Sequence, residues 1–284
     1  MQEKIIAFVD GSIYSQSVCE HAAWIATRTG APVDLLHVIG RRDTAGPSDF
    51  SGSIRLGARS RLLAELAEVD AQRAKLLQER GRAILEDARR ILDEAGVLEV
   101  ATRLRYGDIV ETVAEQEAGA SMILVGKRGE AADFAKLHLG SNLERIVRAS
   151  TRPVFVAARG FRPIRKLLIA FDGGRSALKA VDHVARGKLY AGLGVRLVTV
   201  GPDTPEARKA LDGGAALLKG AGLAVETTIV QGQPDEALAA MIEGEGFDML
   251  VMGAYGHSRI RTLVIGSTTA EMLRSCKVSV VLIR

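Results

Sequence analysis

Nearly continuous apolar runs alternate along this chain with stretches in which apolar residues recur at helical spacing. The runs are rich in Val, Ile, Leu and Met and lie at 33–39, 121–126, 153–158, 195–200, 248–253 and 278–283. Strands without polar alternation are typical of parallel sheets that helices cover on both faces. The stretches between them, such as 17–27 and 177–189, have the spacing of amphipathic helices. The alternation predicts an α/β fold with doubly wound parallel sheets, which bind ligands at the carboxyl ends of their strands.

The whole pattern occurs twice. IIAFVDGS at 5–12 matches LLIAFDGG at 167–174, and SMILVGKRG at 121–129 matches DMLVMGAYG at 248–256. Between these two matches the first copy is longer than the second, which indicates one insertion. We therefore predict two tandem domains: residues 1–160, with a helical insertion at about 41–95, and residues 161–284.

The insertion starts with a loop rich in Gly, Ser and Pro at 46–57 and continues with helical spacing and many charge pairs four residues apart. We expect one long helix that Gly96 is suited to stop and that can bend at Gly81. A solvated helix flanking the sheet is the favoured interpretation, and a helix that docks a partner is the alternative. Its alternating Glu and Arg residues argue against contact with a membrane.

A glycine-rich segment follows the fourth strand of the second copy and carries the chemistry. It reads G-x2-G-x9-G-S-T from Gly253 to Thr268 and leads into a predicted helix. Glycines let the backbone approach a ligand closely, and the free N–H groups at a helix N-terminus favour anions. Ser and Thr at such a place are also ordinary helix caps. Taken with both upstream glycines, the segment favours phosphate binding.

The sequence resembles the universal stress protein family, whose ATP-binding members carry this same spacing after strand 4 and an Asp at the end of strand 1. The resemblance covers both copies and implies five-stranded sheets in the order 3-2-1-4-5, with the last strands, 153–158 and 278–283, pairing the two copies edge to edge. It implies that ATP, with Mg²⁺ as its possible partner ion, lies against a set of residues in the second copy. These are Ala170, Phe171, Asp172, Val200, Met252, Gly253, Gly256, His257, Arg259, Gly266, Ser267 and Thr268.

The first copy departs from the pattern. Its corresponding residues are Val9, Asp10, Val38, Gly126, Gly129, Gly140, Ser141 and Asn142. The loop between Gly129 and Gly140 is one residue longer and carries Glu130 and Asp133, which oppose a polyphosphate unless Mg²⁺ or nearby cations, Lys127, Arg128 and Lys136, compensate them. Whether the first copy binds a nucleotide or acts as a structural partner stays open.

Several candidate residues have an ordinary structural interpretation. Asp10 and Asp172 each precede Gly, which is a common turn signal after a strand. The aligned His21 and His183 fall within the first helix of each copy, where a buried or helix-face histidine is the expected role, and we leave them outside the site. The two cysteines, Cys19 and Cys276, have no metal-ligand spacing and are expected to be small core residues.

Composition narrows the class of protein. Aromatic residues make up 4% of the chain and no basic run is interleaved with them, which argues against nucleic-acid binding. No apolar run reaches the length of a membrane span, and the first residues lack the pattern of a secretory signal, so we expect a cytoplasmic protein without a membrane partner. The net charge of +4 is compatible with an anionic small ligand but does not require one.

The sequence predicts a nucleotide-binding regulatory module of the stress-response type, with slow or no hydrolysis of ATP. None of the common catalytic motifs is present, and no convincing base for phosphoryl transfer can be named. We expect no catalytic residue and no metal ligand from the protein alone, an intramolecular pseudo-dimer, a regulatory protein partner, and compatibility with further homodimerisation. The alternatives are a slow ATPase or adenylate-forming enzyme, and a scaffold that binds no ligand.

Overall fold

The computed structural model describes residues 3–40, 56–129, 141–254 and 267–284, with side chains omitted at 56–63, 141, 267 and 268. The first half contains β1 (Lys4–Phe8), α1 (Ile13–Thr29), β2 (Val33–Gly40), α3 (Leu56–Glu94), β3 (Val100–Gly107), α4 (Ile109–Gln116), η1 (Glu117–Gly119), β4 (Ala120–Gly126), α5 (Ser141–Ala149) and β5 (Val154–Ala157). The second half contains β6 (Lys166–Ala170), α6 (Arg175–Arg186), η3 (Lys188–Tyr190), β7 (Gly194–Val200), α7 (Pro205–Gly220), β8 (Ala224–Val230), α8 (Pro234–Glu245), β9 (Met249–Gly253), α9 (Ser267–Ser275) and β10 (Ser279–Ile283).

All ten strands form one sheet in the order β3-β2-β1-β4-β5-β10-β9-β6-β7-β8. Within each half the strands run parallel and follow the predicted order 3-2-1-4-5, which confirms the fold class. The halves meet where β5 and β10 pair antiparallel, with Val156 opposite Val280 and Val154 opposite Leu282. This junction, called the seam below, confirms the predicted edge-to-edge pairing and covers two strand edges that would otherwise invite aggregation.

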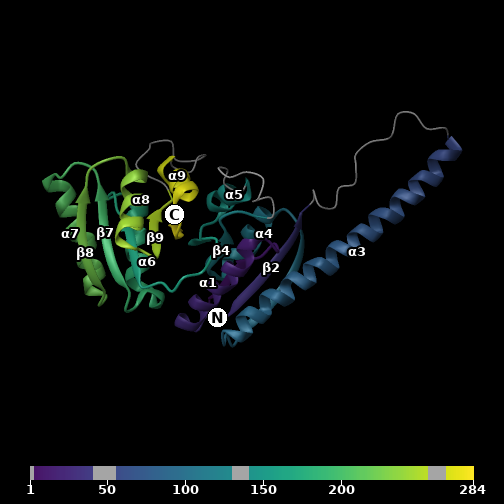
Figure 1. Cartoon of the computed structure of the whole chain (residues 1–284), viewed down its shortest axis with the longest axis horizontal. Helices are drawn as coiled ribbons and strands as arrows, with labels where there is room; N and C mark the ends of the chain where they lie inside the picture. Colours follow the sequence, from purple (N-terminus) through teal and green to yellow (C-terminus); the bar gives the residue numbers. More distant parts are fainter. Residues whose placement is uncertain (1–2, 41–55, 130–140, 255–266) are drawn as a thin grey trace.

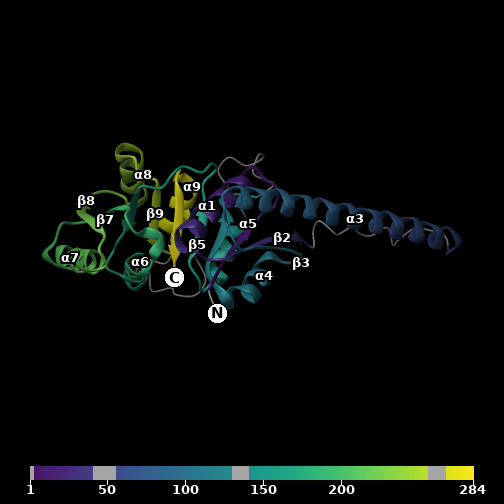
Figure 2. The same cartoon turned by 90° about the horizontal axis from the view of Figure 1, so that it is seen from below.

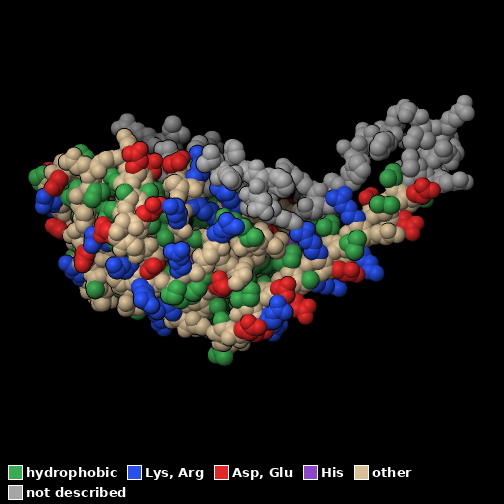
Figure 3. All heavy atoms as spheres, in the orientation of Figure 1, with side chains coloured by type: hydrophobic (Ala, Val, Ile, Leu, Met, Phe, Trp, Pro, Cys, Tyr) green, Lys and Arg blue, Asp and Glu red, His purple; other side chains and the backbone are tan. Residues whose placement is uncertain are grey.

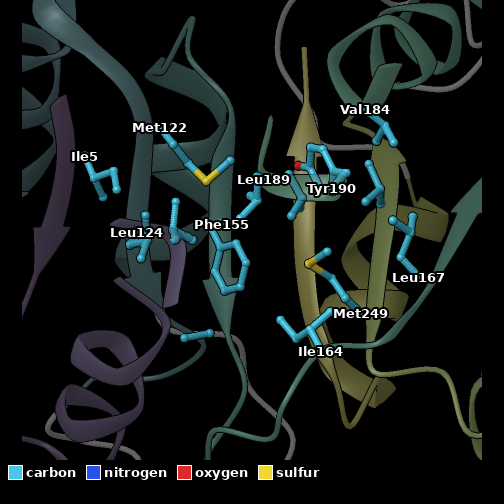
Figure 4. Packing of buried hydrophobic residues seen from close by; sticks show 14 of the residues in the cluster. Ile5, Met122, Leu124, Phe155, Ile164, Leu167, Val184, Leu189, Tyr190 and Met249 are labelled. Carbon is cyan, nitrogen blue, oxygen red and sulfur yellow. The ribbon is translucent and has the colours of Figure 1, made fainter. Parts of the chain in front are cut away.

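The two faces of the sheet are covered by different helices, and each face has one continuous core across the seam. One core takes its helical residues from α1, α3, α6 and α7, and the other takes them from α4, α5, α8 and α9. Figure 4 shows the first core at the seam, where Met122, Leu124 and Phe155 of the first half lie near Leu189, Tyr190 and Met249 of the second. The halves therefore share their hydrophobic core as well as their sheet.

Buried polar contacts also join the halves. The ring centroid of His21 on α1 lies 5.0 Å from that of Phe155, and Nε2 of His21 lies 2.9 Å from Oγ of Ser279 on β10. At the end of α1, the guanidinium of Arg28 donates from Nε to the carbonyl oxygen of Leu189 in η3 at 2.8 Å. These contacts hold α1 of the first half against the second half.

Helix α3 is 39 residues long, which corresponds to about 58 Å at about 1.5 Å per residue. Its last part covers the sheet over β2 and β3, as α7 covers β7 and β8. Its first part extends beyond the other described elements in both views (Figures 1 and 2). The predicted single helix is confirmed, and it ends just before Gly96, whose φ of 80° suits a stop. In the described part of the chain, no helix has the length and hydropathy needed to cross a bilayer.

Candidate functional site

The carboxyl ends of β9, β6 and β7 lie side by side in the second half. The chain leaves β6 toward β7 on one side and later returns to β9 on the other, so this edge is the switch in strand order at which such sheets bind ligands. Ala170 at the end of β6 is in register with Val198 and Met252 on the flanking strands. The structure therefore brings together four of the predicted positions, Ala170, Val200, Met252 and Gly253, at one edge.

Phe171 and Asp172 form the turn that follows β6. Phe171 is buried, and its carbonyl oxygen accepts a hydrogen bond of 2.8 Å from Oγ1 of Thr199. Asp172 is exposed, and its Oδ1 accepts a hydrogen bond of 2.8 Å from the backbone N–H of Gly174, where α6 begins. Gly173 between them has a φ of 73°, which favours glycine. Asp172 thus has the turn role that its sequence allows, and it is exposed at the edge where β6, β7 and β9 end.

Gly253 is required where β9 meets α6. A Cβ built on Gly253 would lie 2.5 Å from Oγ of Ser176, closer than real Cβ atoms pack, and 3.0 Å from its backbone carbon, which is tighter than most real contacts. The first half repeats the arrangement, because a Cβ on Gly126 would lie 2.8 Å from Cβ of Tyr14 on α1. Sequence reasoning assigned these glycines to ligand access and missed Ser176 and Tyr14. The alignment of a glycine in both copies, including the copy with the altered motif, was the available signal for a packing role.

The remainder of the glycine-rich segment reaches α9. Helix α9 begins at Ser267, where the motif predicted a helix start. Gly256, His257, Arg259 and Gly266 lie outside the described residues, as do the side chains of Ser267 and Thr268. Thr269, which the sequence did not single out, is buried and donates from Oγ1 to the carbonyl oxygen of Ala254 at 3.3 Å. This contact places the first turn of α9 beside the end of β9.

The corresponding edge of the first half brings Asp10 and Gly129 together. The Oδ1 atom of Asp10 accepts hydrogen bonds from the N–H of Ser12 at 2.9 Å and from Oγ of Ser15 at 3.0 Å. Its other oxygen lies 2.9 Å from the position that a Cβ on Gly129 would take. The carboxylate is therefore engaged in the turn that starts α1 and also lies against the loop after β4.

The other predicted positions of the first half fall at the ends of β1, β2 and β4 or beyond them. Val9 is buried and Val38 is half-buried. The carbonyl oxygen of Val9 accepts a hydrogen bond of 2.8 Å from Nδ1 of His37, as the carbonyl oxygen of Phe171 accepts one from Thr199 in the second half. Asn142 is exposed on α5. Gly140 and the side chain of Ser141 lie outside the described residues.

Lys127 points across the seam. It is buried, its Nζ donates to the carbonyl oxygen of Cys276 just after α9, and burial lowers the pKa of its ammonium group. The sequence had suggested that Lys127 offsets the acidic residues of its own loop beside a phosphate. Its ammonium is instead engaged at the end of a helix in the other half, so this cation holds the halves together.

The two aligned histidines are structural, as expected. Burial lowers the pKa of His21 and of His183 to about 4, so both rings are neutral at pH 7. Nδ1 of His21 lies 2.6 Å from the carbonyl oxygen of Ser17, and Nε2 of His183 lies 3.0 Å from the hydroxyl of Tyr190. Across the residues that the structure describes, no group of three or more His, Cys, Asp or Glu residues is arranged to hold a metal ion.

Comparison with known proteins gives two matches to the Universal stress protein family, over residues 1–158 and 163–284. Universal stress protein Slr1230 of Synechocystis is 36% identical over 99% of this chain and 100% of its own length. A universal stress protein of Mycolicibacterium smegmatis is 25% identical over 99% of this chain and 96% of its own. The crystal structure of a universal stress protein from Archaeoglobus fulgidus has the same fold, with a TM-score of 0.75 and 21% identity over 100% of this chain and 99% of that one.

Proposed function

The chain belongs to the universal stress protein family, and from this premise we propose that its second half binds one ATP molecule and acts as a nucleotide-dependent regulatory module. The observation that carries the proposal is the intact G-x2-G-x9-G-S-T spacing between β9 and α9, at the edge where the carboxyl ends of β6 and β7 also lie. We take residues 1–160 and 161–284 as the two domains and the cytoplasm as the location.

Each group at this edge has a role that its chemistry suits. Ala170 and Val200 offer small or apolar surface to an adenine ring, while Met252 and Gly253 end the strand that would pass under the nucleotide. The exposed carboxylate of Asp172 can accept hydrogen bonds from ribose hydroxyls. The backbone from Gly256 to Gly266 and the start of α9 supply N–H groups for the phosphates, with Ser267 and Thr268 as further donors. His257 and Arg259 add positive charge, and Mg²⁺ can accompany the phosphates.

The first half fits a structural role better than a second ATP site. Its loop carries Glu130 and Asp133, and the ammonium of Lys127 donates to the carbonyl oxygen of Cys276 in the other half. An anionic ligand would therefore meet like charges with one fewer cation to offset them. We propose that the first half stabilises the second across the seam.

The regulatory interpretation rests on what ATP would do to the segment between β9 and α9. Binding that engages residues 253–268 favours the arrangement of this segment that fits the nucleotide, and a partner that prefers this arrangement then binds more tightly. Slow or absent hydrolysis suits such a signal. The competing enzyme hypotheses, a slow ATPase or an adenylate-forming enzyme, predict release of ADP, or of AMP and pyrophosphate, in a sensitive turnover assay.

Aligned substitutions in the two halves test the site. Gly266→Asp puts a carboxylate where the phosphates are proposed to lie, and Gly140→Asp makes the same change at the matching position of the first half. We expect binding of a fluorescent ATP analogue to be lost in the first variant and kept in the second. Full affinity in Gly266→Asp would overturn the assigned site, and absence of nucleotide binding in the unmodified protein would favour the ligand-free scaffold.

A further inference from the structure

The last part of helix α3 buries one side against the sheet, whereas its first part leaves the described side chains of all its sides largely exposed. We call residues 56–80 the projection. Within its described side chains, at 64–80, only Leu66, Leu77 and Gln78 are even half-buried, whereas Gly81, Leu85, Ala88 and Leu92 beyond it are buried against the sheet. Figure 3 shows the described side chains of the projection extending away from the other described parts of the molecule, with apolar, acidic and basic side chains on the visible face.

Large apolar side chains of the projection face water. Val69 is 58% exposed and Leu76 is 65% exposed, and their spacing of seven positions, about two helical turns, brings both to one side of the helix. A helix that stands alone in water is marginally stable, because helices in proteins depend mainly on packing of an apolar side. The projection therefore has the composition of a helix that another surface covers.

Charge is divided along the same helix. The charged residues of 64–72 are all acidic: Glu65, Glu68 and Asp70. Residues 73–82 instead carry Arg73, Lys75, Arg80 and Arg82 against a single Glu79. A second helix lying alongside would be attracted if its basic part faced the acidic part of the projection and its acidic part faced the basic part. That is the arrangement that an antiparallel copy of the projection offers.

We propose that two copies of this chain form a dimer through antiparallel packing of their projections. If the two-fold axis passes between residues 72 and 73, Val69 lies at the level of Leu76 in the other copy. The same alignment brings Glu65 level with Arg80 and Asp70 level with Lys75. One register thus matches the apolar residues and the opposite charges together.

A second copy suits this surface better than the other occupants. A parallel pair would set acidic part against acidic part and basic against basic, which is unfavourable. A membrane would have to accept the acidic residues 65, 68 and 70 beside the apolar ones. An isologous pair also closes on itself, so it forms a dimer and not a fibre.

Removal of the apolar contacts tests the proposal. We expect sedimentation velocity of the full chain to show a dimer. Val69→Gln combined with Leu76→Gln should raise the dissociation constant of this dimer at least about 100-fold, because both copies carry the two substitutions and four apolar side chains are lost from the interface. The control is Leu217→Gln on α7, which removes a side chain that is 55% exposed outside the projection. The proposal is overturned if the unmodified chain stays monomeric even at a concentration 100-fold above that used for the doubly substituted variant. It is also overturned if the variant carrying both substitutions dimerises as tightly as the unmodified chain.

Charge reversal tests the antiparallel direction. One variant carries Glu65→Lys, Glu68→Lys and Asp70→Lys, and the other carries Arg73→Glu, Lys75→Glu and Arg80→Glu. Each alone should be monomeric, because the charges that face each other across the pair, at 65 and 80 and at 70 and 75, then have the same sign. An equimolar mixture should form a heterodimer. Thermal unfolding of the nucleotide-free monomers should match that of the unmodified chain at a concentration where it too is monomeric, since these residues lie outside the packed core. A mixture of folded variants that stays monomeric contradicts the antiparallel pair.

Discussion

Substitution of Gly253 by alanine tests whether this glycine serves packing. The added Cβ would lie 2.5 Å from Oγ, 2.7 Å from Cβ and 3.0 Å from the backbone carbon of Ser176. Overpacking of this kind costs about 1–3 kcal/mol, and a clash that includes backbone belongs in the upper half of that range. We therefore expect Gly253→Ala to lower the free energy of unfolding by about 2–3 kcal/mol without any nucleotide present.

Urea unfolding of the nucleotide-free protein measures this cost, and a double-mutant cycle assigns it to the contact. Ser176→Gly removes Oγ and Cβ but leaves the backbone carbon, so the double variant should recover at least about 1 kcal/mol relative to additivity. The control is Gly213→Ala on α7, where nothing lies within 4 Å of the new methyl and helix propensity favours alanine by about 0.5–1 kcal/mol. If Gly253→Ala unfolds at the same urea concentration as the unmodified protein but has lost its affinity for ATP, the packing argument is refuted. The glycine would then be needed only for access of the ligand.

Three further predictions concern the seam and the buried thiols. Ser279→Ala should cost about 1–3 kcal/mol, because Oγ of Ser279 serves both His21 and a buried backbone N–H, whereas Ser275→Ala on the exposed end of α9 should cost below about 0.5 kcal/mol. His21 has a pKa of about 4 when folded and of 6.5 when exposed, so the unfolded chain binds more protons between these values and stability falls as the pH drops from 6.5 to 4. The loss attributable to His21 reaches about 3 kcal/mol, and unfolding curves of His21→Gln should have a correspondingly smaller pH dependence. Burial raises the pKa of Cys19 to about 12 and also raises that of Cys276, so neither thiol should react with a disulfide reagent at pH 8 until the protein unfolds.

The parallel sheet could be predicted because strands buried on both faces leave continuous apolar runs, and because the repeat shows most of these strands twice. The order of the strands followed from the resemblance to the family. Pairing of 153–158 with 278–283 followed from the resemblance to the family, and the seam confirms it. Helix α3 was predicted from spacing. Its departure from the sheet was not, because its apolar periodicity continues with little change through Gly81, where burial begins.

The contacts of the candidate site were harder to predict because they join residues far apart in the sequence. Nothing local at Gly253 indicates Ser176, and nothing at Lys127 indicates that its ammonium will reach the carbonyl of Cys276. The strand-end positions Ala170, Val200 and Met252 were predicted to lie together and do so, since parallel strands end at a common edge. Their part in binding a nucleotide stays a prediction.

The number of ATP molecules bound by each chain tests the central claim most directly. Calorimetric titration of ATP into the full chain, first freed of any nucleotide carried through purification, gives this number and the affinity in one experiment. We predict one ATP for each chain, with binding lost in Gly266→Asp and kept in Gly140→Asp. Two molecules for each chain, or one that only Gly140→Asp removes, would contradict the assignment of the site to the second half, and no binding at all would contradict the proposed function.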